Sequence, residues 1–352
     1  TLGGWIATNA SGMKKNRYGN IEDIVENVTM ISPKGIIEQV EPLARASIGF
    51  KPQNILFGSE GNLGIITKAI LKIHEKPKVK KYNSVMFKNW ETGVEFLYNL
   101  SRTNFIPSSV RLVDNVQFRF GQALKPRREG LMKIKANIQK FFVINVKGFN
   151  ADEMCATTFV MEGTSSEVRY QEKNILALAK KHGGLVGGSD NGKRGYLLTF
   201  AIAYVRDFLT DFHIIGETME TTVPWSKIDE VCKAATETLF ELHAKHNVPG
   251  KPYISYRIPQ IYHTGVCIYF MLGMSVKNIP HSEDLFGNIE HAIRKVIMEH
   301  GGSISHHHGV GKLRKDFMDA TLSDSSMELI KDMKNAHDPG NVFGIGNGIF
   351  AK

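Results

Sequence analysis

Residues 57–67, "FGSEGNLGIIT", place a turn rich in glycine, serine and asparagine directly before a strand-forming run. Residues 7–20, "ATNASGMKKNRYGN", form a second turn of the same kind. Turns of this composition expose backbone N–H groups that can hold phosphate oxygens, although each one alone also fits an ordinary hairpin loop. Neither turn has the G-x-G-x-x-G spacing before a helix or the Walker A pattern. The sequence therefore predicts either two hairpin loops or a nucleotide site built without a Rossmann unit.

The segment around these turns, residues 1–75, is rich in short strands and has a weak helical signal. Residues 27–32 ("NVTMIS") and 36–40 ("IIEQV") read as two strands joined by a turn that Gly35 closes. Residues 63–73 ("LGIITKAILKI") form another strand-like run before Pro77. We expect this segment to be mainly β-structure with little helix.

From Pro77 onward the pattern changes to repeated strand–helix–strand units. In one unit Thr164 and Glu167 have the spacing of a capping box, and Gly183 is a helix stop. This order predicts an α+β domain in which helices pack on a sheet. The expected strands cover residues 84–87, 109–114, 156–163, 253–258 and 266–272, with a short return strand after the helix at 165–184. The expected helices cover 90–103, 165–184, 226–245 and 282–300.

The composition narrows the class of protein. The chain of 352 residues is 42% hydrophobic, which suffices for a large core in two or more domains. It has no apolar run of about 18 residues, so we expect no spanning helix. Cys155, Cys232 and Cys267 are odd in number and lack scaffold spacing, which favours a reducing compartment without a disulfide framework.

The net charge of +9 suits an anionic partner, namely nucleic acid, an acidic membrane surface or a phosphorylated substrate. The basic residues are spread along the chain, and no basic run is interleaved with aromatic residues. This distribution argues against nucleic acid as the partner.

Three adjacent histidines, His306, His307 and His308, lie between glycines in "SHHHGVGKLR", residues 305–314. In an extended chain only the first and third imidazoles would share a face, and no C-x-x-C or H-E-x-x-H spacing supplies further ligands. We therefore predict no metal site. The remaining interpretations are a solvated loop or a tight segment whose glycines let a ligand approach the backbone.

A family resemblance extends this reading. Residues 3–20 and 58–67 resemble the second half of the FAD-binding domain of the vanillyl-alcohol oxidase superfamily, in which a ferredoxin-like cap domain follows the flavin domain. Lactate- and glycolate-oxidising members carry an E-H-G-type motif near the C-terminus. The triple histidine, with "RGYLLTFAIAYVRD" (194–207) and "GVCIYF" (265–270), is instead similar to the ether-lipid-forming branch.

The resemblance implies three parts: the C-terminal part of an FAD-binding domain at 1–77, a cap or substrate domain at 78–300, and a C-terminal segment at 301–352 whose histidines line the active site. The superfamily's upstream P-x-G-G-G-type pyrophosphate loop is missing. We therefore expect the chain to be the C-terminal part of a longer protein. Any targeting signal would then lie outside this chain, since the C-terminus carries no S-K-L address.

The implied activity belongs to ether-lipid and plasmalogen biosynthesis. The acyl chain of acyl-dihydroxyacetone phosphate is exchanged for a long-chain fatty alcohol, and FAD is used without net redox change through a bond between flavin N5 and a substrate carbon. Peripheral membrane association, a homodimer and the lumenal side of the peroxisomal membrane are implied as well. The alternatives are an FAD-dependent 2-hydroxy-acid dehydrogenase of the lactate or glycolate type, and an inactive lipid-binding relative.

The resemblance also assigns catalytic residues. One of the three histidines, His307 by preference, would be the acid/base at the substrate carbon, and Tyr269 matches the catalytic tyrosine. A histidine suits this role because its ordinary pKa lies near neutrality. A purely structural alternative for Tyr269 is a strand aromatic in the core.

The resemblance also assigns roles to two arginines, each of which could instead form an ordinary ion pair. Arg206 matches an active-site arginine that would hold the substrate phosphate, or it pairs with Asp207 or Asp211 on the surface. Arg111 matches a functionally sensitive position near the flavin, or it pairs with Asp114.

The flavin contacts implied by the resemblance fall in the N-terminal segment and in the turn at 57–67. Asn62 stands where a threonine is common in the family. The implied contact residues are Thr1, Thr8, Asn9, Ala10, Ser11, Glu60, Gly61, Asn62, Leu63, Gly64, Ile65 and Ile66.

Overall fold

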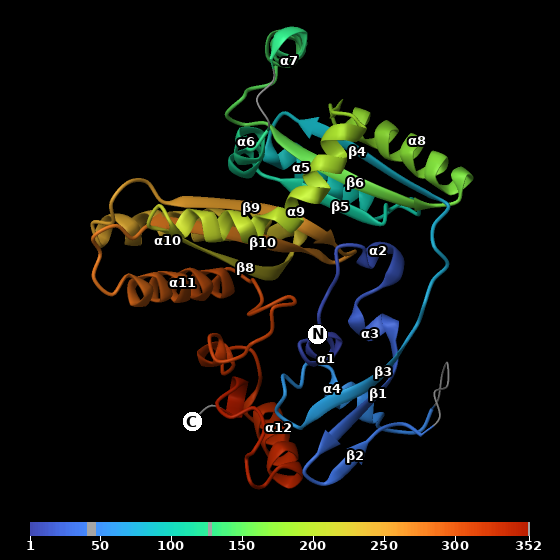
Figure 1. The fold of residues 1–352 in the computed structure, drawn as a ribbon, viewed down its shortest axis with the longest axis vertical. Coiled ribbons are helices and arrows are strands. Elements are labelled where there is room, and N and C mark those ends of the chain that lie inside the picture. The colour runs from blue at the N-terminus through green and yellow to red at the C-terminus, as the bar shows by residue number, and fades with distance from the viewer. Residues whose placement is uncertain (41–46, 126–128, 351–352) are drawn as a thin grey trace. The chain divides into compact units, whose positions relative to one another are not determined.

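The computed structural model describes residues 1–40, 47–125 and 129–350 and divides the chain into two compact units (Figure 1). Unit 1 comprises residues 1–76 and 303–352, and unit 2 comprises residues 77–302. Pro77, where the sequence pattern changes, is thus the first residue of unit 2.

Unit 1 contains a three-stranded antiparallel sheet in the order β2-β1-β3. Its strands are β1 (Val25–Ser32), β2 (Gly35–Ile37) and β3 (Ile65–Leu71). The predicted hairpin is confirmed, because Ser32 pairs with Gly35 in the register of β1 and β2. Gly35 has a positive φ of 116°, a conformation that favours glycine.

The expectation of little helix in the first 75 residues was wrong. Among the described residues of this segment are four short helices: α1 (Leu2–Ala7), α2 (Lys15–Tyr18), α3 (Ile21–Ile24) and α4 (Pro52–Leu56). Local capping supports them, since the Thr1 hydroxyl accepts from Gly4 N at 3.1 Å and Asn20 and Asp23 form a capping box. Helices this short lack the hydrophobic period that the sequence analysis relied on.

A small apolar core holds these helices on the sheet. Ile6, Ile21 and Leu56 from the helices bury against Val28 and Met30 of β1. The C-terminal part of unit 1 adds the 3₁₀ turn η3 (Lys315–Phe317), the helix α12 (Asp324–His337) and the 3₁₀ turn η4 (Gly348–Phe350). Helix α12, which begins after the N-cap Ser323, was not predicted.

Unit 2 is built on a seven-stranded antiparallel sheet in the order β7-β4-β6-β5-β9-β10-β8. Its strands are β4 (Val79–Phe87), β5 (Ser109–Val113), β6 (Cys155–Gly163), β7 (Leu185–Val186), β8 (Ile214–Pro224), β9 (Tyr253–Ile261) and β10 (Gly265–Ser275). The five predicted strands of this region are confirmed, and so is the short return strand, which is β7. β8 was not predicted.

The four predicted helices are also present, and the Thr164–Glu167 capping box is formed. Gly183 follows the end of its helix with a φ of 68°. These helices are α5 (Trp90–Leu100), α8 (Ser165–Lys181), α10 (Ile228–Lys245), preceded by the 3₁₀ turn η2 (Trp225–Lys227), and α11 (Ser282–Glu299). Helices α10 and α11 run side by side (Figure 1).

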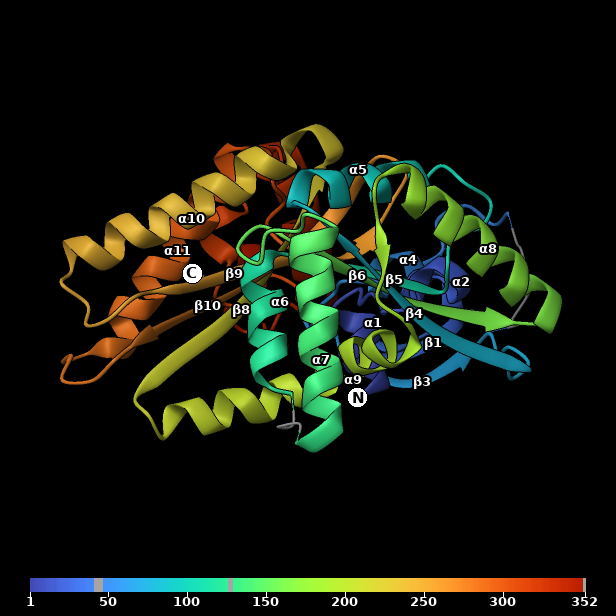
Figure 2. The same cartoon turned by 90° about the horizontal axis from the view of Figure 1, so that it is seen from above.

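The sequence analysis missed three further helices and a π-helix in unit 2. They are α6 (Asn115–Ala123), α7 (Gly130–Phe141), the π-helix η1 (Phe142–Val146) and α9 (Ser189–Thr210) (Figure 2). Helix α9 contains the run "GYLLTFAIAYV", in which apolar residues follow one another without the period of an amphipathic helix. Asp114, predicted as a strand end, is instead the N-cap of α6.

The two faces of the unit 2 sheet differ in chemistry. One face is covered by α5, α8, α10 and α11 and carries the main apolar core, including Val110, Leu112, Ile258, Ile268 and Phe270. On the other face, the residues alternating with these include Arg111, Thr158, Arg257 and Tyr269. Helix α9 lies on this second face, since the Arg111 guanidinium donates a hydrogen bond to the Thr199 hydroxyl of that helix.

Candidate functional site

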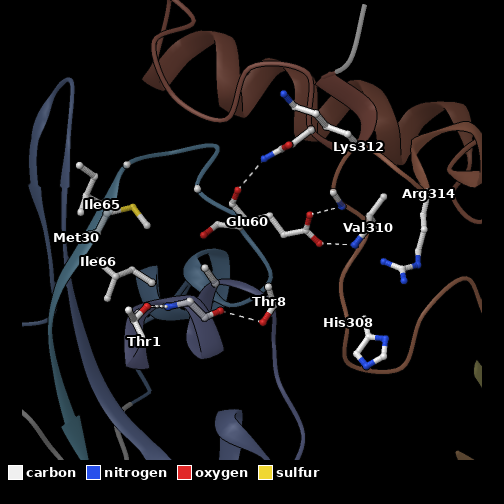
Figure 3. A pocket seen from close by; sticks show the side chains of 18 of the residues that line it. Thr1, Thr8, Met30, Glu60, Ile65, Ile66, His308, Val310, Lys312 and Arg314 are labelled. Atoms are coloured by element: carbon white, nitrogen blue, oxygen red, sulfur yellow. Dashed lines mark hydrogen bonds between the residues drawn. The ribbon is translucent and has the colours of Figure 1, made fainter. Parts of the chain in front are cut away.

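A cavity of about 580 Å³ lies in unit 1 beside the turn at 57–67 (Figure 3). Seven of the predicted flavin-contact residues line it: Thr1, Thr8, Glu60, Gly61, Gly64, Ile65 and Ile66. His308, one of the three histidines predicted to line the active site, also lines it. The structure adds lining residues that were not predicted, namely Gly3, Gly4, Ala7, Met30, Ser59, Val310, Gly311, Lys312, Leu313, Arg314 and Asn347.

The other five predicted contacts do not line this cavity. Asn62 and Leu63 are buried within unit 1, where the Asn62 side chain donates to the Ser59 carbonyl at 2.8 Å and Leu63 joins the small core. Ser11 donates to the Asn20 side chain at 2.5 Å, and Asn9 and Ala10 lie near it on the same turn. Only the two ends of the loop at 60–66 therefore line the cavity, and the middle of the loop is buried within unit 1.

Glycine is required where this loop meets the sheet. Gly64 has a φ of 157°, and a Cβ placed there would come within 2.3 Å of the Ile31 carbonyl oxygen. At Gly61, with a φ of 76°, a Cβ would meet no atom within 4 Å. Gly64 thus allows close packing on β1, while Gly61 leaves the backbone open toward the cavity.

The Glu60 side chain joins this loop to the segment that carries the histidines. Its carboxylate accepts hydrogen bonds from Val310 N and Gly311 N, each at 2.6 Å (Figure 3). The Glu60 carbonyl accepts a third bond from the Asn347 side chain at 3.1 Å. Glu60 itself has a φ of 46°, which is uncommon outside glycine. We call this arrangement the Glu60 latch, a positioning role that the sequence analysis did not anticipate.

The three histidine rings pack against one another. The Nδ1 atoms of His306 and His307 are 2.8 Å apart, and the ring centroids of His307 and His308 are 4.5 Å apart. Two Nδ1 atoms at this distance form a hydrogen bond only if one is protonated and the other is not. Of the three, His308 lines the cavity, beside Val310 (Figure 3). The distance therefore places the two rings so that one can donate a proton to the other.

A buried ion pair holds the turn at 57–67 from its far side. The Lys334 ammonium of α12 contacts the Asp338 carboxylate and donates to the carbonyls of Asn62 and Phe343, each at 2.8 Å. Asp338 also accepts from Phe343 N at 2.9 Å. Burial raises the pKa of Asp338, but the Lys334 side chain and backbone N–H groups lower it more, to about 2. We call this group the Lys334 brace.

The cavity has the features that an anionic cofactor needs. Lys312 and Arg314 place cationic side chains at it, and the Arg314 guanidinium donates to the Gly309 carbonyl at 2.9 Å. The carboxylate of Glu60 is already bound by two N–H groups. Glycines at the wall expose backbone to a ligand. These residues fit part of a dinucleotide such as FAD, and the K-x-R spacing after the histidines is a signal that sequence reasoning could have used.

Unit 2 contains the predicted Tyr269, and the structure does not place it in the apolar core. Tyr269 lies on the second face of the sheet, where its hydroxyl donates to the Thr218 hydroxyl at 2.9 Å. Its ring lies over the Arg257 guanidinium, with the Arg257 Cζ 4.2 Å from the ring centroid. Arg257 was not singled out from the sequence. The sequence offered one signal: Arg257 is the single charged residue in β9 and stands next to the buried Ile258.

Arg111 is buried on the same face as Tyr269. Burial, together with the positive charge of Arg257, lowers the pKa of Arg111 to about 9. The carboxylate of Asp114 accepts a hydrogen bond from Gln117 N at 2.8 Å as the cap of α6. Burial raises the pKa of Asp114 to about 7.

Arg206 lies on α9 and is exposed. Its Nη2 is 3.4 Å from the Asp207 carboxylate, and both side chains are more than half exposed. This contact is the surface pairing that the sequence left open, and it leaves the guanidinium accessible to a ligand.

Comparison with known proteins places this chain among flavoproteins. The family described as "FAD linked oxidases, C-terminal domain" matches residues 76–347, and the family described as "FAD binding domain" matches residues 1–41. The α+β fold expected for such a chain is confirmed. Two relatives are the alkyldihydroxyacetonephosphate synthases of Caenorhabditis elegans, 41% identical over 99% of this chain, and of Dictyostelium discoideum, 28% identical over 97%.

The chain spans 58% and 55% of the length of those two relatives. A solved structure of an alkyldihydroxyacetonephosphate synthase superposes with a TM-score of 0.77 at 24% identity, covering 98% of this chain and 57% of that one. At that identity the likeness establishes the fold.

Proposed function

Because this chain belongs to the FAD-linked oxidases, we propose that the protein is an FAD-dependent alkyldihydroxyacetonephosphate synthase. It would exchange the acyl chain of acyl-dihydroxyacetone phosphate for a long-chain fatty alcohol. The likeness to the synthases over 99% of the chain supports this proposal. The structural observation that carries it is the contact between His306 and His307, because the exchange requires proton transfer.

The exchange balances without net oxidation. One C–O bond to the departing acyl group breaks, one C–O bond to the alcohol oxygen forms, and the alcohol proton leaves with the fatty acid. FAD, when bound, supplies a reversible attachment for the substrate carbon and ends in its starting redox state. The residues of this chain would bind the substrate, orient it and move protons.

The His306–His307 pair would serve the carbon-bound proton. With one Nδ1 protonated and the other not, the pair would accept a proton and return it without exchange with solvent. We assign the acid/base role to His307, which contacts both of its neighbours. The Glu60 latch fixes the segment that follows, at Val310 and Gly311.

Tyr269 would handle the proton of the entering alcohol. Its hydroxyl is already in a hydrogen bond with Thr218, which offers a path for that proton.

Arg206 would hold the substrate phosphate through its exposed guanidinium, since a planar fork of donors matches phosphate oxygens. Arg111, buried under α9, would orient that helix through Thr199.

A redox test distinguishes this function from its alternative. The purified enzyme with FAD should exchange acyl for alkyl chains without any external electron acceptor. A 2-hydroxy-acid dehydrogenase would instead bleach its flavin with D-lactate or glycolate and require an acceptor for turnover. Turnover that consumes oxygen or a dye in proportion to product would overturn the synthase proposal.

The proton-transfer role of His307 has a separate test. His307→Ala should slow exchange of the substrate's carbon-bound hydrogen with solvent deuterium by about 10²–10⁴-fold. A matched control is His246→Ala, at the exposed end of α10. Exchange at the rate of the unsubstituted enzyme in His307→Ala would remove this histidine from the mechanism.

Peripheral membrane association is part of the proposal because both substrates carry long alkyl chains. Among the helices that the structure describes, none has the length and apolarity to span a bilayer. Helix α7 carries Ile134, Ile138 and Phe141 at the spacing of one helix face, and each of these side chains is more than half exposed. Ile138→Glu should weaken co-sedimentation with lipid vesicles, and Asn288→Glu, at an exposed position of α11, should not. Equal binding by both variants would exclude this face.

A homodimer and a peroxisomal location complete the proposal. Both are implied by the family resemblance of the sequence. Sedimentation of the purified protein would test the first, and imaging of a tagged protein in cells would test the second.

A further inference from the structure

Arg257 occupies a position that the proposed function does not yet use. It lies on β9 directly opposite Tyr269 on β10, and it is also paired with Val113 on β5. Arg111 is two residues before Val113, so it falls on the same face of the sheet. Two arginines and the proposed catalytic tyrosine therefore share one side of unit 2.

The Arg257 side chain is buried without the partners that a buried charge normally has. It is 6% exposed, and its Nε has no hydrogen-bond partner. Within the part of the chain that the structure describes, no carboxylate forms an ion pair with it. Glu220 lies one strand further away, across Tyr269 in the register. The contact that remains to the guanidinium is the ring of Tyr269.

Burial is the main influence on the charge of Arg257. Burial lowers the pKa of Arg257, and the charge of Arg257 in turn helps to lower that of Arg111. A buried ion without a counter-ion is expensive, and a guanidinium over an aromatic ring recovers only part of that free energy. Folded proteins keep such a charge where a ligand supplies the missing anion.

We propose that Arg257 binds an oxyanion of the substrate beside Tyr269. The guanidinium would offer its planar fork of N–H donors to two oxygens of that group, while the tyrosine ring fixes its plane. The proposal rests on the proposed function for the source of the oxyanion, which is either the substrate phosphate or the carboxylate of the departing fatty acid. With Arg206 proposed to hold the phosphate, the two sources are separable by experiment.

The sign of a stability change distinguishes this role from a structural one. If Arg257 binds an oxyanion of the substrate, Arg257→Met removes an uncompensated buried charge from the ligand-free enzyme. That enzyme should then melt at the same or a higher temperature. If Arg257 is a structural element, the same change should lower the melting temperature. Arg169→Met, on the exposed surface of α8, is the matched control.

Anion-induced stabilisation identifies the source. The ligand-free enzyme is titrated with inorganic phosphate in one series and with octanoate in another, and the melting temperature is followed. A rise that Arg257→Met abolishes and Arg169→Met retains assigns that anion to Arg257. If neither anion gives a rise that depends on Arg257, the proposal is overturned. This titration requires no turnover, so its result does not depend on whether the protein has synthase activity.

Kinetics provide the second readout and a safeguard against misfolding. In Arg257→Lys, which keeps the charge but loses the fork, the KM for acyl-dihydroxyacetone phosphate should rise by about 10- to 150-fold. If phosphate is the partner, KM should change more than kcat. If the leaving carboxylate is the partner, kcat should fall as well. Unchanged KM and kcat in a folded Arg257→Lys enzyme would contradict the proposal.

Discussion

Lys334 in unit 1 and Arg257 in unit 2 are both buried cations, but their surroundings are opposite. Lys334 is 3% exposed and contacts the Asp338 carboxylate and two carbonyl oxygens. Arg257 is 6% exposed and faces the ring of Tyr269, with its Nε unbonded. A cation whose donors are satisfied by the protein is part of the structure. A cation left unsatisfied points to a ligand, because the desolvation of its charge is not recovered within the fold.

Removing Lys334 is the strongest test of the first half of this comparison. Lys334→Met would leave Asp338 buried without its counter-ion, and we expect a loss of about 3–5 kcal/mol in the free energy of unfolding. The measurement is urea unfolding of the enzyme, with Lys331→Met on the exposed face of α12 as the control. If the two variants unfold at the same urea concentration, Lys334 does not hold unit 1 together.

In the Glu60 latch the anion has its hydrogen-bond partners within the protein, so removing its charge should also lower stability, but by less than Lys334→Met. Glu60→Gln removes the charge and one acceptor oxygen from the bonds to Val310 N and Gly311 N. We expect a loss of about 1.5–3 kcal/mol in stability, since hydrogen bonds to a charged group are worth that much. Hydrogen exchange of the peptide covering residues 305–314 should become faster.

Glu75→Gln, at an exposed position, provides the matched control for the latch. Unchanged protection of the Val310 and Gly311 amides in Glu60→Gln would show that the carboxylate does not position the histidine loop.

The Lys334 brace also predicts a pH dependence. The pKa of Asp338 is lowered in the folded protein from its ordinary 3.8 to about 2. Stability from this group is therefore fully present above about pH 4 and is lost as the pH falls toward 2. The effect should be smaller than that of removing Lys334, because the backbone donors remain. Asp338→Asn should flatten this part of the stability curve, and an equal slope in both proteins would contradict the assignment.

Arg206 offers the smallest stability effect. Its contact with Asp207 is exposed, and such pairs contribute at most about 1 kcal/mol. Arg206→Met should therefore leave the melting temperature nearly unchanged while raising the KM for acyl-dihydroxyacetone phosphate. A large loss of stability would reassign Arg206 to the structure and leave the phosphate to another residue.

The sequence predicted the elements whose period or capping is local. The strands and helices of unit 2 that follow the alternation of apolar residues are present, and so is the Thr164–Glu167 capping box. The sequence analysis missed α9 because its apolar run has no amphipathic period, and it missed α1 to α4 because they are too short to show one. For the site, the sequence identified the turn at 57–67 and the histidine loop.

What the sequence determined by itself, then, was the chemistry available: a glycine turn open to a ligand, three adjacent imidazoles, and a strand that carries Tyr269. The tertiary structure decided which groups satisfy one another. Glu60 reaches Val310 across 250 positions of the chain, and Lys334 reaches Asn62 across 272. Whether a buried charge is paired depends on such long-range contacts, and no local pattern encodes them. Only the fold could show that Lys334 has its partners and that Arg257 has no counter-ion among the residues that the structure describes.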